Sequence, residues 1–139
     1  MKRKVFIFVP MVVLVVMGLC SCNKTSEPVD IHNSRISLDW EGVYTGTIPS
    51  ASGSGINVRM QLNKDNTYEL TYDYIDKPEN GFTSTGNFKW DDTGNTIKTD
   101  IADAPSYYKV AQNKLIQLDM EGNLITGDLA DNYVLMKNK

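Results

Sequence analysis

Apolar and polar residues alternate along most of the chain from about residue 39 onward. The clearest stretch is residues 56–74, where two alternating rows flank the polar segment Lys64-Asp65-Asn66. The apolar positions of the two rows are Ile56, Val58, Met60, Leu62, Tyr68, Leu70, Tyr72 and Tyr74. A period of two is typical of strands with one buried face, and a short polar turn joins such strands. The pattern therefore predicts an antiparallel hairpin.

The same alternation predicts further short strands on both sides of this hairpin. Upstream, residues 39–56 are interpreted as a first strand and a tight corner, because Ser52-Gly53-Ser54-Gly55 interrupts the pattern. Downstream, turn-forming residues separate strands predicted at 82–90, 96–101, 107–111, 114–119 and 132–137. No window is typical of a helix. We expect an all-β, small antiparallel meander barrel of about six to eight strands, since closure leaves no exposed sheet edge.

The first residues differ in composition from the rest. Lys2, Arg3 and Lys4 precede an apolar run over residues 5–19, which is typical of a secretory signal peptide and short for a membrane span. The run ends in Leu19-Cys20-Ser21-Cys22 rather than in a positively charged stop-transfer cluster. Lipoprotein signals prefer a leucine three residues before the modified cysteine and a small residue just before it, which fits Cys22 and not Cys20. We expect a signal peptide over residues 1–21.

Lipid attachment at Cys22 makes the membrane the first expected partner. Several acyl chains, such as palmitate, anchor a protein stably because each buried methylene contributes about 0.8 kcal/mol. Residues 22–38 show no sustained period and predict a flexible linker of roughly 20 Å before a barrel domain at 39–139. The single histidine, His32, lies in this linker without a second ligand at metal-binding spacing, so we expect it to be solvated.

The charge of the chain without residues 1–21 is acidic. Eleven Lys or Arg side chains remain against seventeen Asp or Glu, a net charge of −6. Nucleic acids and anionic lipid surfaces reward clustered basic residues, so this balance argues against both as partners.

The opening of the predicted barrel resembles a known family. Its pattern is Asp39-Trp40, Gly42, Tyr44, Gly46, Ile48-Pro49 and Gly55-Ile56. This pattern is similar to the N-terminal domain of the NlpE family, bacterial outer-membrane lipoproteins called copper resistance proteins, and the likeness extends over roughly residues 39–137. It implies a lipocalin-like barrel in the cell envelope, lipid-anchored in the outer membrane and facing the periplasm. It also implies a role in copper response, surface sensing or envelope stress signalling.

One departure from the family pattern concerns its chemistry. The family usually carries Pro-Cys-x-x-Cys after the first strand, whereas this chain has Pro49-Ser50-Ala51-Ser52-Gly53. Ser50 and Gly53 offer no thiolate, so we expect neither tight copper(I) binding nor redox activity, and no metal or other cofactor. Three methionines could be soft ligands, but their strand pattern favours the core. They are Met60, Met120 and Met136.

The sequence contains no arrangement typical of an enzyme. The serines near residue 50 have no histidine in the folded part to act as a base, and Asp91-Asp92 lies in a turn. Asp119, Glu121 and Asn123 alternate in a loop but lack the calcium-loop spacing.

Two functions of different class therefore remain open. The first is an envelope surveillance or interaction lipoprotein that contacts a signalling protein. The second is a carrier of a small apolar ligand inside the barrel. The candidate ligand-lining residues are Tyr68, Tyr72, Tyr74 and Trp90. An interior filled by side chains favours the first function and a continuous cavity favours the second.

Overall fold

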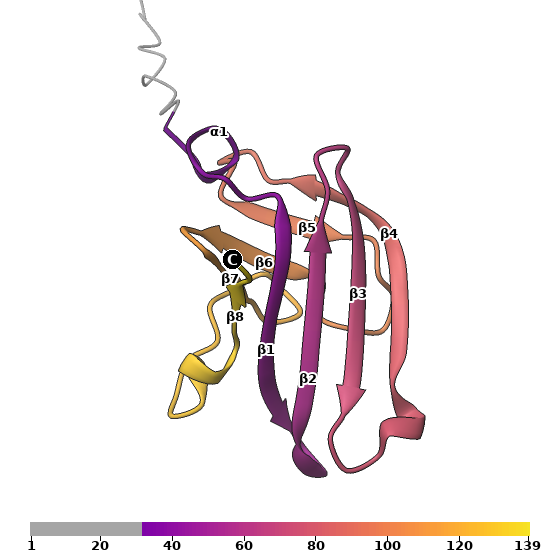
Figure 1. The fold of residues 1–139 in the computed structure, drawn as a ribbon. Helices are drawn as coiled ribbons and strands as arrows, with labels where there is room; N and C mark the ends of the chain where they lie inside the picture. Colours follow the sequence, from indigo (N-terminus) through magenta and orange to yellow (C-terminus); the bar gives the residue numbers. More distant parts are fainter. Residues whose placement is uncertain (1–31) are drawn as a thin grey trace, which may run out of the picture.

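Eight antiparallel strands follow one another in sequence order in the computed structural model, which describes residues 32–139 (Figure 1). The strands are β1 (Gly42–Ser50), β2 (Gly53–Leu62), β3 (Thr67–Tyr74), β4 (Phe82–Trp90), β5 (Thr96–Thr99), β6 (Tyr107–Ala111), β7 (Lys114–Gln117) and β8 (Val134–Lys137). β8 pairs with β1 and closes the barrel. The predicted all-β meander barrel is confirmed.

The alternation in the sequence becomes rows of inward side chains that cross neighbouring strands. In register from one end of the barrel to the other, the rows of β1 to β4 are Ile48-Ile56-Tyr74, Gly46-Val58-Tyr72-Phe82, Tyr44-Met60-Leu70-Ser84 and Gly42-Leu62-Tyr68-Gly86. From the other side of the barrel, Ile97, Tyr108, Leu115 and Leu135 are fully buried as well. Side chains therefore fill the middle of the barrel.

Closure between β1 and β8 depends on a glycine. A Cβ atom at Gly46 would lie 2.6 Å from the carbonyl oxygen of Val134 and 2.9 Å from a methyl group of Leu135. Backbone atoms cannot give way at such a distance, so only glycine lets the two strands approach this closely.

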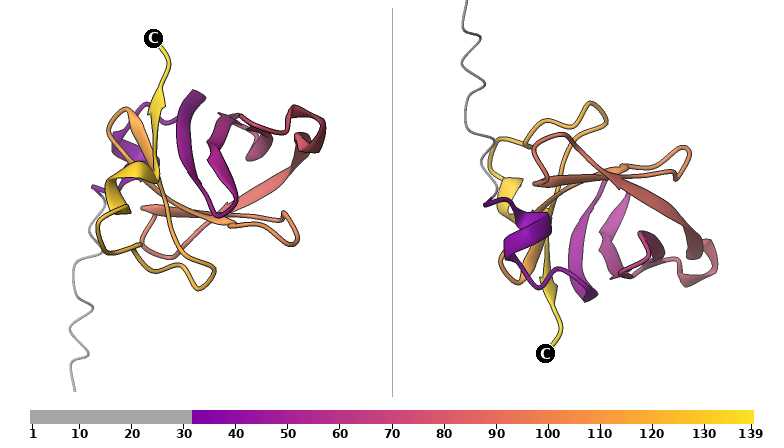
Figure 2. Two further views of the ribbon diagram at one scale, coloured as in Figure 1. Left: turned by 90° about the horizontal axis from the view of Figure 1, so that it is seen from below. Right: turned by 90° about the horizontal axis from the view of Figure 1, so that it is seen from above.

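A short helix, α1 (Ser34–Ser37), lies at the end of the barrel where the described chain begins (Figures 1 and 2). The Asn33 side chain accepts a hydrogen bond from Ile36 N and caps it. Ser34 N donates to Asn95 Oδ1 (2.9 Å), and Ser34 Oγ donates to the carbonyl oxygen of Val110 (2.7 Å). The prediction of no helix is therefore wrong here, and the end of the segment assigned to a linker is bonded to the barrel.

Several predicted strand limits are also corrected. β1 and β2 meet at a two-residue turn, because Ser50 pairs with Gly53, so residues 53–55 of the predicted corner already belong to β2. β5 ends at Thr99 because the Asp100 carboxylate accepts hydrogen bonds from Asn87 N and Tyr68 Oη. β7 ends at Gln117, since the Asp119 side chain closes a turn by accepting from Glu121 N and Asn123 N.

Short 3₁₀ turns account for the remaining differences. They are η1 (Pro78–Asn80), between β3 and β4, and η2 (Ala130–Asn132), which shortens the last predicted strand to Val134–Lys137. Among residues 32–139, no helix has the length and apolar character needed to cross a membrane.

The methionines separate into one core residue and two surface residues. Met60 is fully buried, as expected. Met120 is 62% exposed in the turn after β7, and Met136 is 55% exposed because Leu135 takes the inward position of β8. The core prediction is wrong for both of them.

Candidate functional site

The two ends of the barrel differ in how they are covered. At the α1 end, the Trp40 ring meets Phe88 and Trp90 edge-on, with centroids 5.9 and 5.4 Å apart. Trp40 Nε1 donates to the carbonyl oxygen of Arg35 (3.0 Å), and Tyr44 Oη donates to that of Trp40 (2.6 Å). Aromatic packing and the chain leading from α1 therefore close this end.

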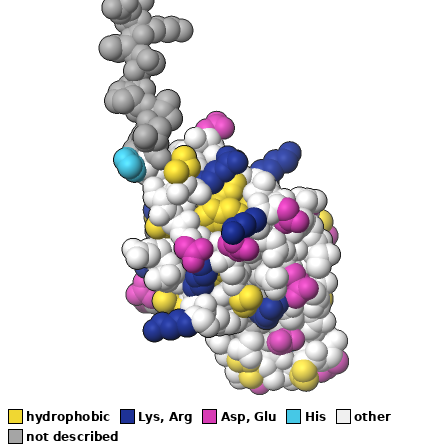
Figure 3. Space-filling model, turned by 45° about the horizontal axis from the view of Figure 1, so that its top comes forward, with side chains coloured by type: hydrophobic (Ala, Val, Ile, Leu, Met, Phe, Trp, Pro, Cys, Tyr) yellow, Lys and Arg dark blue, Asp and Glu magenta, His cyan; other side chains and the backbone are white. Residues whose placement is uncertain are grey.

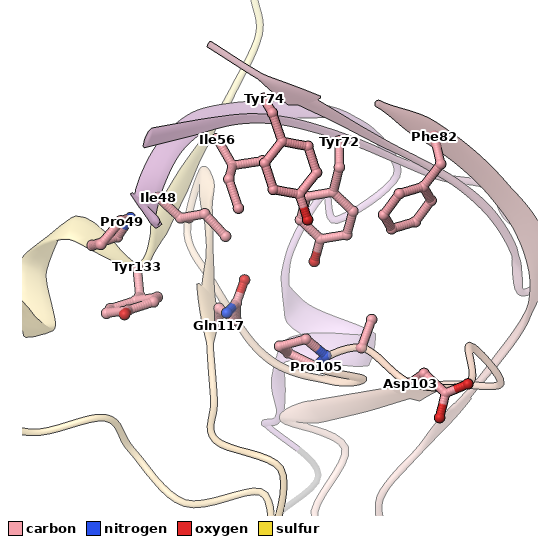
Figure 4. A pocket seen from close by; sticks show the side chains of 11 residues that line it. Ile48, Pro49, Ile56, Tyr72, Tyr74, Phe82, Asp103, Pro105, Gln117 and Tyr133 are labelled. Atoms are coloured by element: carbon pink, nitrogen blue, oxygen red, sulfur yellow. The ribbon is translucent and has the colours of Figure 1, made fainter. Parts of the chain in front are cut away.

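The opposite end carries a half-open pocket with a volume of about 290 Å³ (Figure 4). Ile48, Ile56 and Phe82 supply apolar walls from β1, β2 and β4, and Tyr74 stands at the end of β3. The loop between β5 and β6 completes the rim with residues 103–105. Small-molecule sites begin at about this size and share this mainly apolar character.

Two buried polar atoms face the pocket without a hydrogen-bond partner among the described residues. They are Tyr72 Oη and Gln117 Oε1. The two residues are only 4% and 3% exposed, respectively. Figure 4 shows both side chains pointing into the pocket from different walls. The Tyr72 ring packs against Phe82 with centroids 5.0 Å apart, so its direction is held by contact.

Burial raises the pKa values of two tyrosines around this pocket. Burial raises the pKa of Tyr72, and the nearby Tyr108 hydroxyl opposes this rise. Like an ordinary tyrosine, Tyr72 is protonated at neutral pH and can donate a hydrogen bond. Burial likewise raises the pKa of Tyr108 well above its ordinary value. Tyr108 Oη donates to the carbonyl oxygen of Pro105 (3.4 Å) and so supports the loop at the pocket rim.

The four candidate ligand residues do not form one wall. Tyr72 and Tyr74 line the pocket, as the candidate assignment requires. Tyr68 lies in the row nearest the α1 end and donates to Asp100 Oδ1 (3.1 Å), because its register pairs it with Leu62 and Gly86. Trp90 packs at the closed end against Trp40. The structure therefore does not place Tyr68 or Trp90 in this site.

Gln117 was missed as a site residue although its position carried a signal. It lies two residues after the fully buried Leu115 on β7, and both side chains are buried. A polar side chain at an inward strand position requires a partner or a function. The candidate lipid-bearing Cys22 lies outside the described residues.

The segment that replaces the family's cysteine pair forms the β1–β2 hairpin beside the pocket. Pro49 lines the pocket, and residues 50–53 make the turn. Within residues 32–139, no group of three or more His, Cys, Asp or Glu side chains is placed to hold a metal ion. Figure 3 shows acidic and basic side chains interspersed over the visible face. The pocket is thus the strongest candidate site in the described part of the chain.

The geometry defines a small meander β-barrel with one closed end and one pocketed end. A family model described as the NlpE N-terminal domain matches residues 44–128. The chain belongs to the NlpE family, and the expected resemblance is confirmed.

Individual relatives agree with this assignment. Lipoprotein NlpE of Escherichia coli K12 is 30% identical over 131 residues, which cover 90% of this chain and 53% of that protein. The chain therefore spans about half the length of this curated relative.

Two solved structures share the fold. A candidate lipoprotein from Shewanella oneidensis is 44% identical with a TM-score of 0.70, over 76% of this chain and 95% of that one. Because nearly all of that crystallised chain is matched, this type of barrel folds without a further domain. The Cpx pathway activator NlpE from Escherichia coli is 24% identical with a TM-score of 0.52, over 63% of this chain and 46% of that one, which shows the fold alone.

Proposed function

We propose that this protein is a non-catalytic envelope lipoprotein, anchored in the outer membrane through lipid on Cys22, that faces the periplasm and senses or binds through the open end of its barrel. Membership of the NlpE family supports an envelope lipoprotein. The spacing of Leu19, Ser21 and Cys22 supports the anchor.

The observation that carries this proposal is the direction of the barrel. The described chain enters at α1, and β1 runs from there to the β1–β2 hairpin beside the pocket (Figure 1). The entry point and the pocket are therefore at opposite ends. Cys22 lies ten positions before His32, a span that reaches at most roughly 35 Å when extended. An anchor at Cys22 would thus hold the closed end toward the membrane and leave the pocket accessible from the periplasm.

A signalling role follows by extension from a relative. The Escherichia coli protein of the same fold is described as a Cpx pathway activator. We infer that this chain also reports to an envelope stress pathway, through a protein partner. The absence of the paired cysteines at Ser50 and Gly53 indicates that this role does not use thiolate chemistry.

A carrier that encloses an apolar ligand within the barrel is the less favoured alternative. Tyr44, Met60 and Leu70 are fully buried and occupy the middle of the barrel. The pocket reaches one end only, so a long acyl chain would have to displace core side chains.

The test compares the wild-type chain with Cys22→Ala and Cys20→Ala in bacteria that carry an envelope stress reporter. We expect a fatty-acid analogue to label the wild type and Cys20→Ala but not Cys22→Ala, which should also leave the membrane fraction and lose reporter induction. Equal labelling of Cys22→Ala would contradict the anchor. Full reporter induction by an unlabelled Cys22→Ala chain would contradict the role of the anchor in signalling.

A further inference from the structure

The pocket contains polar groups that the fold itself does not use. Three other buried tyrosines each have an acceptor: Tyr44 donates to Trp40, Tyr68 to Asp100 and Tyr108 to Pro105. Tyr72 Oη and Gln117 Oε1 have none among the described residues. A buried polar atom without a partner destabilises the folded state, whereas phenylalanine or an aliphatic residue would fill the same space without that cost. The two atoms are therefore positioned for a group that enters from outside.

The apolar walls of the pocket indicate the kind of ligand that would fit. Phe82, Tyr74, Ile48 and Ile56 present ring faces and aliphatic surface to the pocket. A cavity of roughly 150 Å³ is sufficient for benzene, so about 290 Å³ suits a body of two fused rings.

The charge of the pocket lining narrows the class of ligand further. Asp103 is the one charged side chain among the described lining residues, and it is acidic. A carboxylate ligand would find no cationic partner among these lining residues, so the lining disfavours fatty acids and other anions.

We propose that the open end of the barrel binds a neutral two-ring aromatic alcohol. A hydroxyl group offers the chemistry that the two orphan atoms lack, because it can accept a hydrogen bond from Tyr72 Oη and donate one to Gln117 Oε1. The rings lie against Phe82, Tyr74 and Ile48. This site supplies a chemical input for the proposed sensing role and rests on that role only for its biological meaning, since binding does not require the lipid anchor.

The probe is 2-naphthol, titrated by calorimetry into residues 23–139. Its matched control is 2-methoxynaphthalene, which keeps the rings and the acceptor but has no donor. We expect saturable one-to-one binding of 2-naphthol and about tenfold weaker binding of the ether, the typical effect of one lost hydrogen bond. Gln117→Met should weaken 2-naphthol about tenfold and leave the ether unchanged. Tyr72→Phe should weaken both ligands.

Tyr44→Phe is the matched protein control, because it removes a tyrosine hydroxyl at the closed end. It should bind 2-naphthol as the wild type does but unfold at a lower temperature, since its hydrogen bond is already made. Without ligand, Tyr72→Phe and Gln117→Met should unfold at the same or a higher temperature than the wild type.

Three results would overturn the proposal. They are absence of saturable 2-naphthol binding to the folded wild type, equal binding by all variants, or a midpoint for Tyr72→Phe as low as that of Tyr44→Phe. The last would show that water already satisfies the hydroxyl. Because the soluble domain is used, failure of lipid labelling at Cys22 is a separate outcome.

Discussion

The closed end and the open end of the barrel are built from the same kinds of side chain but are completed differently. At the closed end, Trp40 covers Phe88 and Trp90, and both Trp40 Nε1 and Tyr44 Oη have acceptors. Trp90 Nε1 is the exception there. At the open end, Tyr72 and Gln117 keep unpartnered polar atoms that face a pocket. The difference comes from what covers the rings rather than from the rings themselves.

The cover at the closed end comes from residues before the first strand. α1 is held by the turn after β4 and by β6, through Ser34, and Arg35 N donates to the carbonyl oxygen of Gly94 (3.0 Å). No comparable segment of residues 32–139 crosses the open end, where the β1–β2 hairpin and the loop at residues 103–105 only form a rim. An aromatic cluster is thus core or candidate site according to whether other chain segments pack over it.

The largest effect on the free energy of unfolding is expected from alkaline pH, which ionises tyrosines at both ends of the barrel. Burial and then the Asp39 carboxylate raise the pKa of Tyr44 to about 12, and burial also raises the pKa of Tyr72 and of Tyr108. An unfolded tyrosine ionises near pH 10. Since the folded pKa values are the higher ones, this stability is fully present below about pH 10 and is lost as the pH rises toward 12.

Urea unfolding at a series of pH values measures this loss. The free energy of unfolding should stay level through pH 9 and then fall steeply. Tyr44→Phe should make the fall shallower because one buried ionisation is removed. A wild-type stability that is unchanged at pH 12 would show that these hydroxyls are not held protonated by burial.

The next effect is expected from removing one ring from each end. Trp40→Ala should lower the free energy of unfolding by about 3 kcal/mol, at the low end for a tryptophan because the ring is only partly buried. Phe82→Ala, at the pocket, should cost about 1 kcal/mol, since Phe82 is 40% exposed and packs mainly on Tyr72. Denaturant melts of the two variants give the comparison directly. Equal losses would mean that the two ends are equally part of the core.

A smaller effect is expected from loosening α1. Ser34→Ala removes the hydrogen bond to the carbonyl oxygen of Val110 and should cost about 1 kcal/mol. Amide hydrogen exchange should increase at Ile36, Ser37 and Leu38, whose N–H groups are bonded within the helix turn. Ser52→Ala, in the exposed turn of the open end, is the matched control and should change neither quantity. Unchanged exchange in Ser34→Ala would show that α1 is held by other contacts.

The sequence predicts those features that depend on contacts between residues close together in the chain, and not those that depend on distant residues. The hairpin of β2 and β3 is local and strictly alternating, so its strands and inward residues could be predicted from residues 56–74 alone. The docking of α1 could not, because Ser34 meets Asn95 and Val110 from 61 and 76 residues away. Four residues with no sustained period carry no local helix signal.

The candidate site shows the same division. Tyr72 and Tyr74 could be proposed because they alternate with polar residues, but the alternation does not say which end of the barrel a tyrosine faces. Tyr68 lies near the start of β3 and Tyr72 and Tyr74 lie near its end, and only the closed barrel shows which of the two ends holds the pocket. Gln117 and Asp103 reach the pocket from β7 and from a loop, and only the closed barrel brings these to β3.

The last prediction is that the hairpin beside the open end does not bind copper(I). Ser50 and Gly53 stand where the family carries paired cysteines, and a neutral hydroxyl is a hard, weak donor for copper(I). Met120 and Met136 are exposed, but they lie on the turn after β7 and on β8, and the described residues contain no cluster of His, Cys, Asp or Glu suited to a metal.

We therefore expect residues 23–139 to leave copper(I) with a competing chelator of nanomolar affinity. The control is Ser50→Cys combined with Gly53→Cys, which restores the Cys-x-x-Cys spacing in the same turn and should capture the metal. Stoichiometric capture by the wild-type domain would show that thioether sulfur or carboxylates form a site without the cysteines, and would make the hairpin irrelevant to metal binding.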